Sequence, residues 1–294
     1  MNTKTLICSL ALVAFAASCT QKEAPETAEE RLPIKLSFDL NTKVTDTYFE
    51  SGDAVGIYVV GYNGSNPGSL ATSGNLYDNV KYSYATSWTG EQVLYWPDKT
   101  TPADFYAYYP YGTPGSVTAY PFAVGSDQSA ASAYKASDFV WGKASGVAPT
   151  SNVVNIPTGH IMSNAVLYIK PGDGFTAESL ASATVAVEIR NVKTNAYVNL
   201  ASGVVTATGT ASKVVPFNEG TRYRAVVVPQ TVADGSELIT VTVNGTAYSL
   251  KKGFTFVSGK QHTFTVTVNK TGSGINIGVG DWDNDGTDNG GDAE

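Results

Sequence analysis

The sequence predicts an all-β protein, and it favours two β-sandwich domains in tandem over one. Helical periodicity is almost absent from the 294 residues. Short runs of alternating apolar and polar residues recur about every 8–12 residues, separated by Gly, Asn, Asp and Pro. The strands expected before His160 are rich in aromatic residues, whereas those after it are rich in Val and Thr. This change in composition places the predicted domain boundary near His160.

The first 18 residues are predicted to be a secretion signal. Lys4 precedes an apolar run and small residues that end at Ser18. About nine apolar residues are too few for a membrane-spanning helix, which needs about 20. The small residues before Cys19 resemble a lipobox, in which the cysteine is acylated and becomes the new N-terminus, although Ala16 replaces the usual Leu. An ordinary signal peptide with an incidental cysteine is the alternative.

Residues 19–31 are predicted to form a lipidated acidic tether. Thr20–Glu30 is polar and acidic and contains Pro, as disordered linkers do. Acyl chains on Cys19 would hold the precursor in a membrane, because each buried methylene contributes about 0.8 kcal/mol. Since Cys8 leaves with the signal and Cys19 is acylated, the mature protein has no thiol for a disulfide, a Cys-ligated metal or a nucleophile.

The mature chain is expected to be acidic. Loss of the signal removes Lys4 and leaves 18 of the 19 basic residues against 26 acidic ones. A surface of this sign disfavours nucleic acid and anionic lipid as partners.

The strands after the tether fall into two kinds. Runs with a period of two predict strands with one buried and one solvent-facing side. Val55–Val60 and Ala225–Val228 are apolar throughout, as expected for central strands. The alternating runs are Ile34–Phe38, Val185–Ile189, Ile239–Val243 and Phe264–Val268.

The stretch Glu91–Tyr111 predicts two aromatic strands joined by a short polar connection. Val93–Trp96 and Phe105–Tyr109 carry apolar or amphipathic residues on both faces. Such strands are expected in the middle of a sandwich, with one face in the core and a Tyr-lined face covered by a loop or a neighbour.

No residues in the sequence predict an enzyme. Both histidines, His160 and His262, lie in or beside strand patterns and are expected to be structural. Phosphate-binding loops, nucleophile elbows and zinc-protease motifs are absent from the sequence. No cofactor is expected.

The segment that runs from Asp281 into the acidic tail, residues 284–294, raises the question of calcium binding. Asp281, Asp283 and Asp285 have the spacing of an EF-hand loop, whose oxygen ligands bind Ca²⁺. However, no helix is predicted on either side, and Asp288 takes the place of an expected apolar residue. A solvated acidic segment is the favoured interpretation.

The motif "YWP" is followed by "FYAYYPY", and further landmarks are spread along the chain. Together they resemble the fimbrillin family, lipoprotein precursors of surface fimbriae in Gram-negative anaerobes, in which such landmarks recur in the same order. This resemblance implies two tandem transthyretin-like sandwiches, over residues 32–160 and 161–283, and a location at the outer membrane and cell surface. The other landmarks are Phe49–Val59, Asp138–Ala144, Ile156–Ile169, Val226–Val232, Gly259–Val268 and Trp282.

The function expected from the sequence is a structural subunit of surface fimbriae that assembles by strand exchange. Loss of one strand from a sandwich leaves a groove that an extended segment of another subunit can fill. Leu32–Leu40 is the candidate for the strand that leaves. Ile275, Ile277 and Val279 alternate with Asn and Gly and form the candidate donor strand.

The resemblance further implies that a surface protease cuts in the loop after the first strand. Lys43 is the candidate processing site, although family members usually carry Arg there. Arg31 is the alternative, and cleavage there would remove only the tether. The expected partners are therefore other fimbrial subunits, a processing protease and, through the lipid anchor, the outer membrane.

Two other functions remain open from the sequence. If neither site is cut, the protein would keep its lipid and serve as a non-polymerising fimbrial anchor. It could instead be a surface glycan-binding lipoprotein whose exposed aromatic rings stack on sugars. Burial of Trp88, Trp96 and Trp141 would favour the fimbrillin interpretation, whereas two or more coplanar exposed rings would favour glycan binding.

Overall fold

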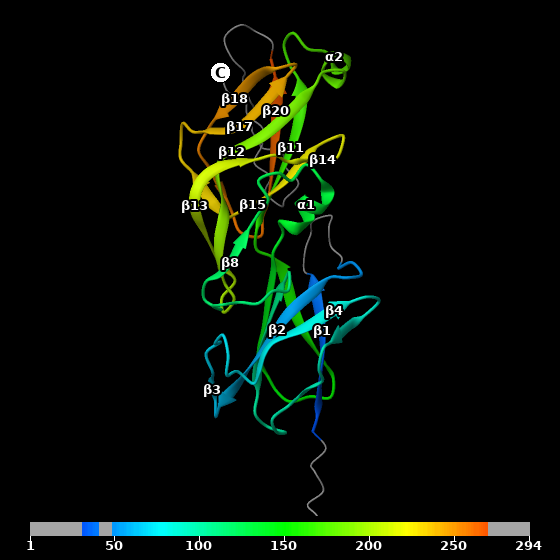
Figure 1. The fold of residues 1–294 in the computed structure, drawn as a ribbon, viewed down its shortest axis with the longest axis vertical. Helices are drawn as coiled ribbons and strands as arrows, with labels where there is room; N and C mark the ends of the chain where they lie inside the picture. Colours follow the sequence, from blue (N-terminus) through cyan, green and yellow to red (C-terminus); the bar gives the residue numbers. More distant parts are fainter. Residues whose placement is uncertain (1–30, 41–48, 270–294) are drawn as a thin grey trace, which may run out of the picture. The chain divides into compact units, whose positions relative to one another are not determined.

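The alternating pattern folds as a β protein throughout the part of the chain that can be described. The computed structural model describes residues 31–40 and 49–269. Within these residues there are twenty strands and two short helices, α1 (Ala131–Ala136) and α2 (Ala177–Ala181) (Figure 1). The all-β prediction is confirmed. No helix in these residues is long and apolar enough to cross a membrane.

The first sheet contains nine strands and curls over its own core. Its order is β5-β4-β2-β7-β9-β10-β1-β6, with β3 paired to β2. Phe38 on β1 lies 5.9 Å from Tyr82 on β4 between ring centroids, although four strands separate β1 from β4 in the sheet. The curled sheet thus forms both layers of a sandwich. Its strands are β1 (Pro33–Leu40), β2 (Ala54–Asn63), β3 (Asn66–Pro67), β4 (Tyr77–Tyr84), β5 (Trp88–Gly90), β6 (Leu94–Tyr95), β7 (Ala103–Tyr109), β9 (Val140–Val147) and β10 (Val153–His160).

The two apolar runs predicted as central strands of the first half, Val55–Val60 and Phe105–Tyr109, lie in the middle of this sheet. They form β2 and β7, which pair with each other. One face packs into the core of the sandwich, and the other carries Tyr58, Tyr106 and Tyr108, which are buried against the segments that follow and against residues of the second half of the chain. The covered Tyr-lined face was expected and is confirmed.

The two aromatic strands of Glu91–Tyr111 do not pair with each other. The first is reduced to β6, which pairs with β1. Val93 is exposed, whereas Leu94 and Trp96 are buried, so β6 has one buried face rather than two. The polar connection explains the separation, because the Asp98 carboxylate accepts hydrogen bonds from Thr100 and closes a local turn.

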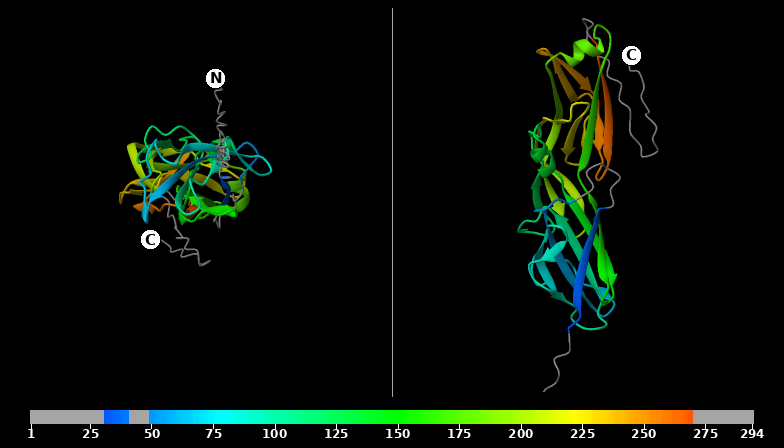
Figure 2. Two further views of the ribbon diagram at one scale, coloured as in Figure 1. Left: turned by 90° about the horizontal axis from the view of Figure 1, so that it is seen from below. Right: turned by 90° about the vertical axis from the view of Figure 1, so that its right-hand side faces the viewer.

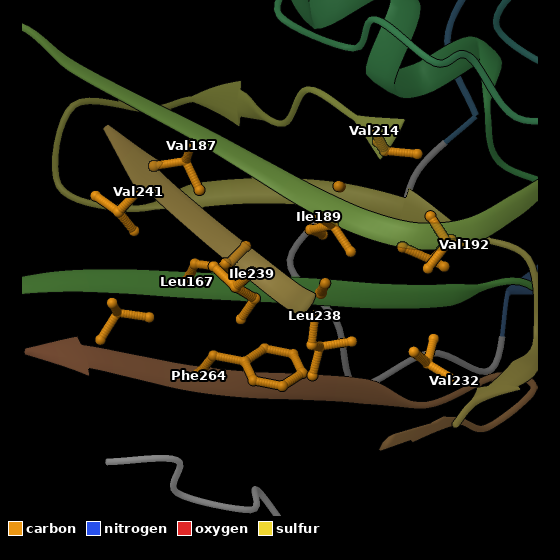
Figure 3. Close-up of a cluster of buried hydrophobic side chains, with 14 of the residues drawn as sticks. Leu167, Val187, Ile189, Val192, Val214, Val232, Leu238, Ile239, Val241 and Phe264 are labelled. Carbon is orange, nitrogen blue, oxygen red and sulfur yellow. The ribbon is translucent and has the colours of Figure 1, made fainter. Parts of the chain in front are cut away.

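The second half contains two larger sheets and a two-stranded one. The larger sheets have the orders β14-β15-β11-β20 and β13-β12-β17-β18, and β8 from the first half adds to β12. Their facing sides enclose a Val- and Leu-rich core that includes Phe264 (Figure 3). The strands are β8 (Tyr120–Ala123), β11 (Ser163–Pro171), β12 (Val185–Asn199), β13 (Val204–Val214), β14 (Phe217–Asn218), β15 (Tyr223–Val227), β16 (Gln230–Val232), β17 (Glu237–Val243), β18 (Thr246–Lys251), β19 (Phe254–Phe256) and β20 (Gln261–Val268).

Strand β17 differs from the prediction of one wet face. Leu238 and Thr240 are buried together with Ile239 and Val241. The strand is central, between β12 and β18, and the Thr240 hydroxyl is satisfied by the Ser249 hydroxyl at 3.1 Å. A threonine can therefore occupy a covered face without an unpaired polar group.

A segment of the first half joins the strands of the second half. Beyond β8, Asp127 forms a bridge with Val215, and the buried Gln128 side chain bonds both backbone groups of Val226. A third cluster of buried residues draws members from both sides of His160. The described residues from Leu32 onward belong to one compact unit. Two tandem transthyretin-like domains therefore stay a prediction.

Candidate functional site: the first strand and its groove

The predicted first strand is observed as β1, between two strands that belong to different parts of the chain. It runs parallel to β10 from Lys35 to Leu40 and antiparallel to β6 at Pro33 and Ile34. In Figure 2 the blue β1 lies beside the green β10. Among the described strands, β1 is the sole partner of β6. Removal of β1 would therefore leave backbone groups of both neighbours unpaired.

One face of β1 is part of the core. Ile34 and Phe38 are buried, and the register places Phe38 beside Ile156 of β10. The Phe38 ring also meets the Trp88 ring edge-on, at 4.9 Å between centroids. Burial of two such side chains contributes about 3–6 kcal/mol. A vacated groove would expose this apolar surface to water, so a replacement strand would be favoured.

The other face of β1 is polar in its middle. Ser37 donates a hydrogen bond to the Asn155 carboxamide oxygen at 3.1 Å, and the Lys35 side chain is exposed to solvent. The alternation predicted for Ile34–Phe38 is thus observed, with Leu36 half-buried. Because of this alternation, the groove should accept a strand with apolar residues at every second position.

The two ends of β1 are held differently. At the start, the backbone N–H of Trp96 donates to the Leu32 carbonyl at 2.9 Å. At the other end, residues 41–48 lie outside the described part, and Phe49 packs on the same Trp88 ring that Phe38 contacts, at 4.8 Å between centroids. Phe38 near the end of β1 and Phe49 directly after the 41–48 segment therefore pack on one tryptophan. A cut within it would leave β1 held by noncovalent contacts.

Most of the predicted site residues lie outside the described residues. These include the lipidation candidate Cys19 and the processing candidate Lys43, and also the donor and calcium candidates. Arg31 is described and is exposed two residues before β1 begins. Within the described ranges, no group of acidic, His or Cys side chains is arranged to hold a metal ion. The candidates outside are Cys19, Lys43, Ile275, Ile277, Val279, Asp281, Asp283 and Asp285.

Both histidines have structural surroundings, as expected. His160 pairs through Nδ1 with the Asp138 carboxylate, and the His262 Nε2 accepts the Val257 N–H at 3.0 Å. The His262 ring also meets Phe254 edge-on.

A buried ion pair beside the central strands was not predicted. Asp104 on β7 is nearly inaccessible and lies 2.9 Å from the Lys143 ammonium. Burial by itself would raise the pKa of the Asp104 carboxyl. Hydrogen bonds from Lys143, from the Gly146 N–H and from the Tyr62 hydroxyl outweigh burial and hold that pKa below its ordinary value. A charged residue inside an aromatic run was the only signal for it in the sequence.

The tryptophans are covered to different degrees. Trp96 is buried and donates through Nε1 to the Thr150 carbonyl. Trp88 and Trp141 are half-buried, and Trp141 donates to the Leu200 carbonyl at 2.7 Å. Tyr197 is the single aromatic side chain classed as exposed among the described residues. The paired coplanar rings expected of a glycan-binding face are therefore not found in this part of the chain.

A family model described as fimbrillin-like matches residues 42–282. The chain belongs to the fimbrillin-like family. The matched range includes most of both halves and the loop that follows β1, and it confirms the family resemblance of the sequence.

Relatives of this fimbrillin-like protein come from Bacteroides. It is 29% identical to "Putative fimbrium subunit Fim1C" of Bacteroides uniformis, over 96% of each chain. It resembles the crystal structure of a "putative cell adhesion protein" from the same species, with 27% identity, a TM-score of 0.65, and coverage of 85% of this chain and 96% of the other. A second "putative cell adhesion protein", from Bacteroides ovatus, shares the fold, with 18% identity, a TM-score of 0.69, and coverage of 86% and 98%.

Proposed function

We propose that this fimbrillin-like protein is a structural subunit of surface fimbriae that polymerises by strand exchange at the β1 groove. The family comprises fimbrial and adhesin-like structural proteins rather than enzymes, and its relatives include a fimbrium subunit and a cell adhesion protein. The observation that carries the proposal is β1 itself, a strand with one apolar face whose Phe38 packs on Trp88 together with Phe49, the first described residue after the strand.

Export as a lipoprotein would bring the subunit to its place of assembly. The signal at residues 1–18 directs secretion, and acylated Cys19 holds the precursor at the outer membrane through the tether of residues 19–31. While β1 is covalently linked, it fills its own groove at a high effective concentration and excludes donors from other subunits. The uncut precursor therefore does not polymerise by strand exchange.

Cleavage after Lys43 changes this competition. The strand becomes a separate peptide that still occupies the groove through Ile34 and Phe38. A donor around Ile275–Val279 of another subunit presents the same alternation of apolar residues and replaces it. Because the contact is head-to-tail and does not close, a filament grows. Each half of the subunit acts as one sandwich of the filament, over residues 32–160 and 161–283.

An anchor role is the second candidate, and the processing site favours it. Thr42-Lys43-Val44-Thr45 lacks the Arg that the processing protease of related subunits would meet. If neither Lys43 nor Arg31 is cut, the lipid remains and the subunit accepts no donor. It would then hold a fimbria to the membrane from its base.

The two roles are separated by limited trypsin treatment followed by electron microscopy. A shaft subunit forms filaments and concentration-dependent ladders after the cut, whereas Lys43→Gln does not, because cleavage at Arg31 removes only the tether and leaves β1 in the chain. Lys99→Gln, which removes an exposed lysine from another loop, is the matched control and should polymerise normally. Truncation before Ile275 should give a subunit that accepts a donor and provides none. Equal polymerisation of truncated and full-length protein would contradict the donor assignment.

A further inference from the structure

The strand β13 is the longest strand at a sheet edge in the part of the chain that the structure describes. It pairs with β12 over its whole length and has no strand partner on its other side among the described residues. In Figure 1 it lies at the margin of its sheet, next to β12. Such an edge presents unpaired N–H and C=O groups, which natural proteins usually protect.

A bulge divides this edge into two parts. Thr208 is opposite Asn195 and Ala211 is opposite Lys193, so Gly209 and Thr210 together face one residue of β12. Gly209 has φ +76, the conformation that glycine supplies in a bulge of this kind. Bulges bend a strand, so Val204–Thr208 is the uninterrupted part of the edge.

The uninterrupted part lacks the usual protection. Val204–Thr208 reads Val-Val-Thr-Ala-Thr, which favours the strand conformation and contains neither a charge nor a proline. By comparison, the edge strand β18 ends at Lys251 and is followed by a second lysine. The edge strand β20 is shorter, with eight residues against eleven in β13.

The face beside this edge is also uncharged and partly apolar. The register places Thr206 beside Tyr197, and Tyr197 beside Pro121 of β8. Val204 lies on the same face two residues from Thr206. Val204 and Tyr197 are 58% and 48% exposed, and they are two of only five large apolar side chains that are exposed in the described residues.

We propose that Val204–Thr208 pairs antiparallel with the same stretch of a second copy of this chain, with Thr206 opposite Thr206. A two-fold pairing of this kind satisfies both edges at once and closes. The chain carries a net charge of −7, so two copies repel each other over most of their surfaces. This neutral edge and face allow them to approach without that repulsion, whereas a basic partner would find no charge here to bind.

The proposed β13–β13 contact is small, so we expect it to be weak. Five residue pairs bury less than the 1,200 Å² or so typical of stable interfaces, so the pair forms weakly between free subunits. If the proposed function holds and subunits are aligned in filaments, many such contacts act together and join filaments side by side. The lateral contact itself requires no cleavage and is tested on uncut protein.

Disulfide trapping tests the register. In the full chain with Cys8→Ser and Cys19→Ser, Thr206→Cys would place two thiols directly opposite each other. Opposed residues in antiparallel strands have Cα atoms about 4.5–5.5 Å apart, within the range that a disulfide needs. Mild oxidation should convert most of this variant to a covalent dimer. Thr246→Cys, on the exposed edge of β18, is the matched control and should give several-fold less dimer.

Sedimentation of the uncut chain tests the energetics. The parent should show reversible dimerisation at about 1 mM, and Thr206→Lys should weaken it at least about tenfold because two ammonium groups would oppose each other. Thr246→Lys adds the same charge at another edge and should leave it unchanged. Circular dichroism establishes that each variant is folded. A monomeric parent at this concentration, or equal trapping of both cysteine variants, would overturn the proposal.

Discussion

Replacement of Gln128 by Ala should strongly destabilise the protein, because the Gln128 side chain makes several buried hydrogen bonds to the backbone. Gln128 is fully buried and its side chain acts as a strand partner for Val226 of β15. Its carboxamide oxygen accepts the Val226 N–H at 2.8 Å, and its amide donates to the Val226 carbonyl at 2.8 Å and to the Gly125 carbonyl at 2.9 Å. The side chain thus ties the segment after β8 to the second half.

The magnitude follows from the groups left behind. Gln128→Ala leaves the N–H and the carbonyl of Val226 without the partners they have now, in a place closed to water. Each such group costs about 1–3 kcal/mol, so we expect a loss of about 3–5 kcal/mol in the free energy of unfolding. That is a large part of the 5–15 kcal/mol typical of a folded domain.

Urea denaturation followed by tryptophan fluorescence measures this loss. Gln128→Met keeps most of the volume and removes the hydrogen bonds, so it separates polar pairing from packing and should still lose about 2–4 kcal/mol. Ser129→Ala, at the exposed neighbour, should change stability by less than about 0.5 kcal/mol. If Gln128→Ala stays within about 1 kcal/mol of the parent, these hydrogen bonds do not hold the segment.

Three further predictions concern the core of the first sheet. Asp104→Asn should lower the free energy of unfolding by about 2–3 kcal/mol at pH 7, measured by urea denaturation, because it breaks the ion pair with Lys143. Since folding lowers the pKa of Asp104, the difference from the parent should shrink as the pH falls below about 4. A difference that stays constant with pH would contradict this. Burial raises the pKa of Tyr58 and Tyr82 to about 12, so both should stay neutral at pH 11 in an ultraviolet titration. Their contribution to stability should be lost as the pH rises from about 10 to 12. Ionisation of every tyrosine near pH 10 would refute this. Phe38→Ala should lower the free energy of unfolding by about 3–5 kcal/mol. After cleavage it should also speed release of the β1 peptide. An unchanged release rate would show that the Phe38 contacts with Tyr82 and Trp88 do not retain the strand.

Local pattern was sufficient for the strands that hold the candidate site. The apolar runs of β2 and β7 require burial on both faces, and the alternation in β1 requires one buried face, whatever the partners are. The strand patterns around both histidines predicted structural side chains, and the structure pairs His160 with Asp138 and places the Val257 N–H on His262.

Pairing between distant segments could not be predicted. β1 pairs in parallel with β10, more than a hundred residues away, and the apolar pattern of neither strand indicates which strand it pairs with. β8 is four residues long and joins a sheet of the second half. Gln128 has no local signal, because its role depends on backbone groups of a strand that is 98 residues away. Contacts of this kind are fixed by the whole fold rather than by period or propensity.

The fate of the β1 peptide after cleavage tests the central proposal most directly. Full-length protein is cut with trypsin, and the fractions of peptide bound to assembled and to unassembled protein are measured by mass spectrometry. Strand exchange predicts that assembled subunits have lost the peptide containing Ile34 and Phe38, while unassembled ones keep it. Filaments that retain a full complement of this peptide, or that form without any cleavage, would contradict it.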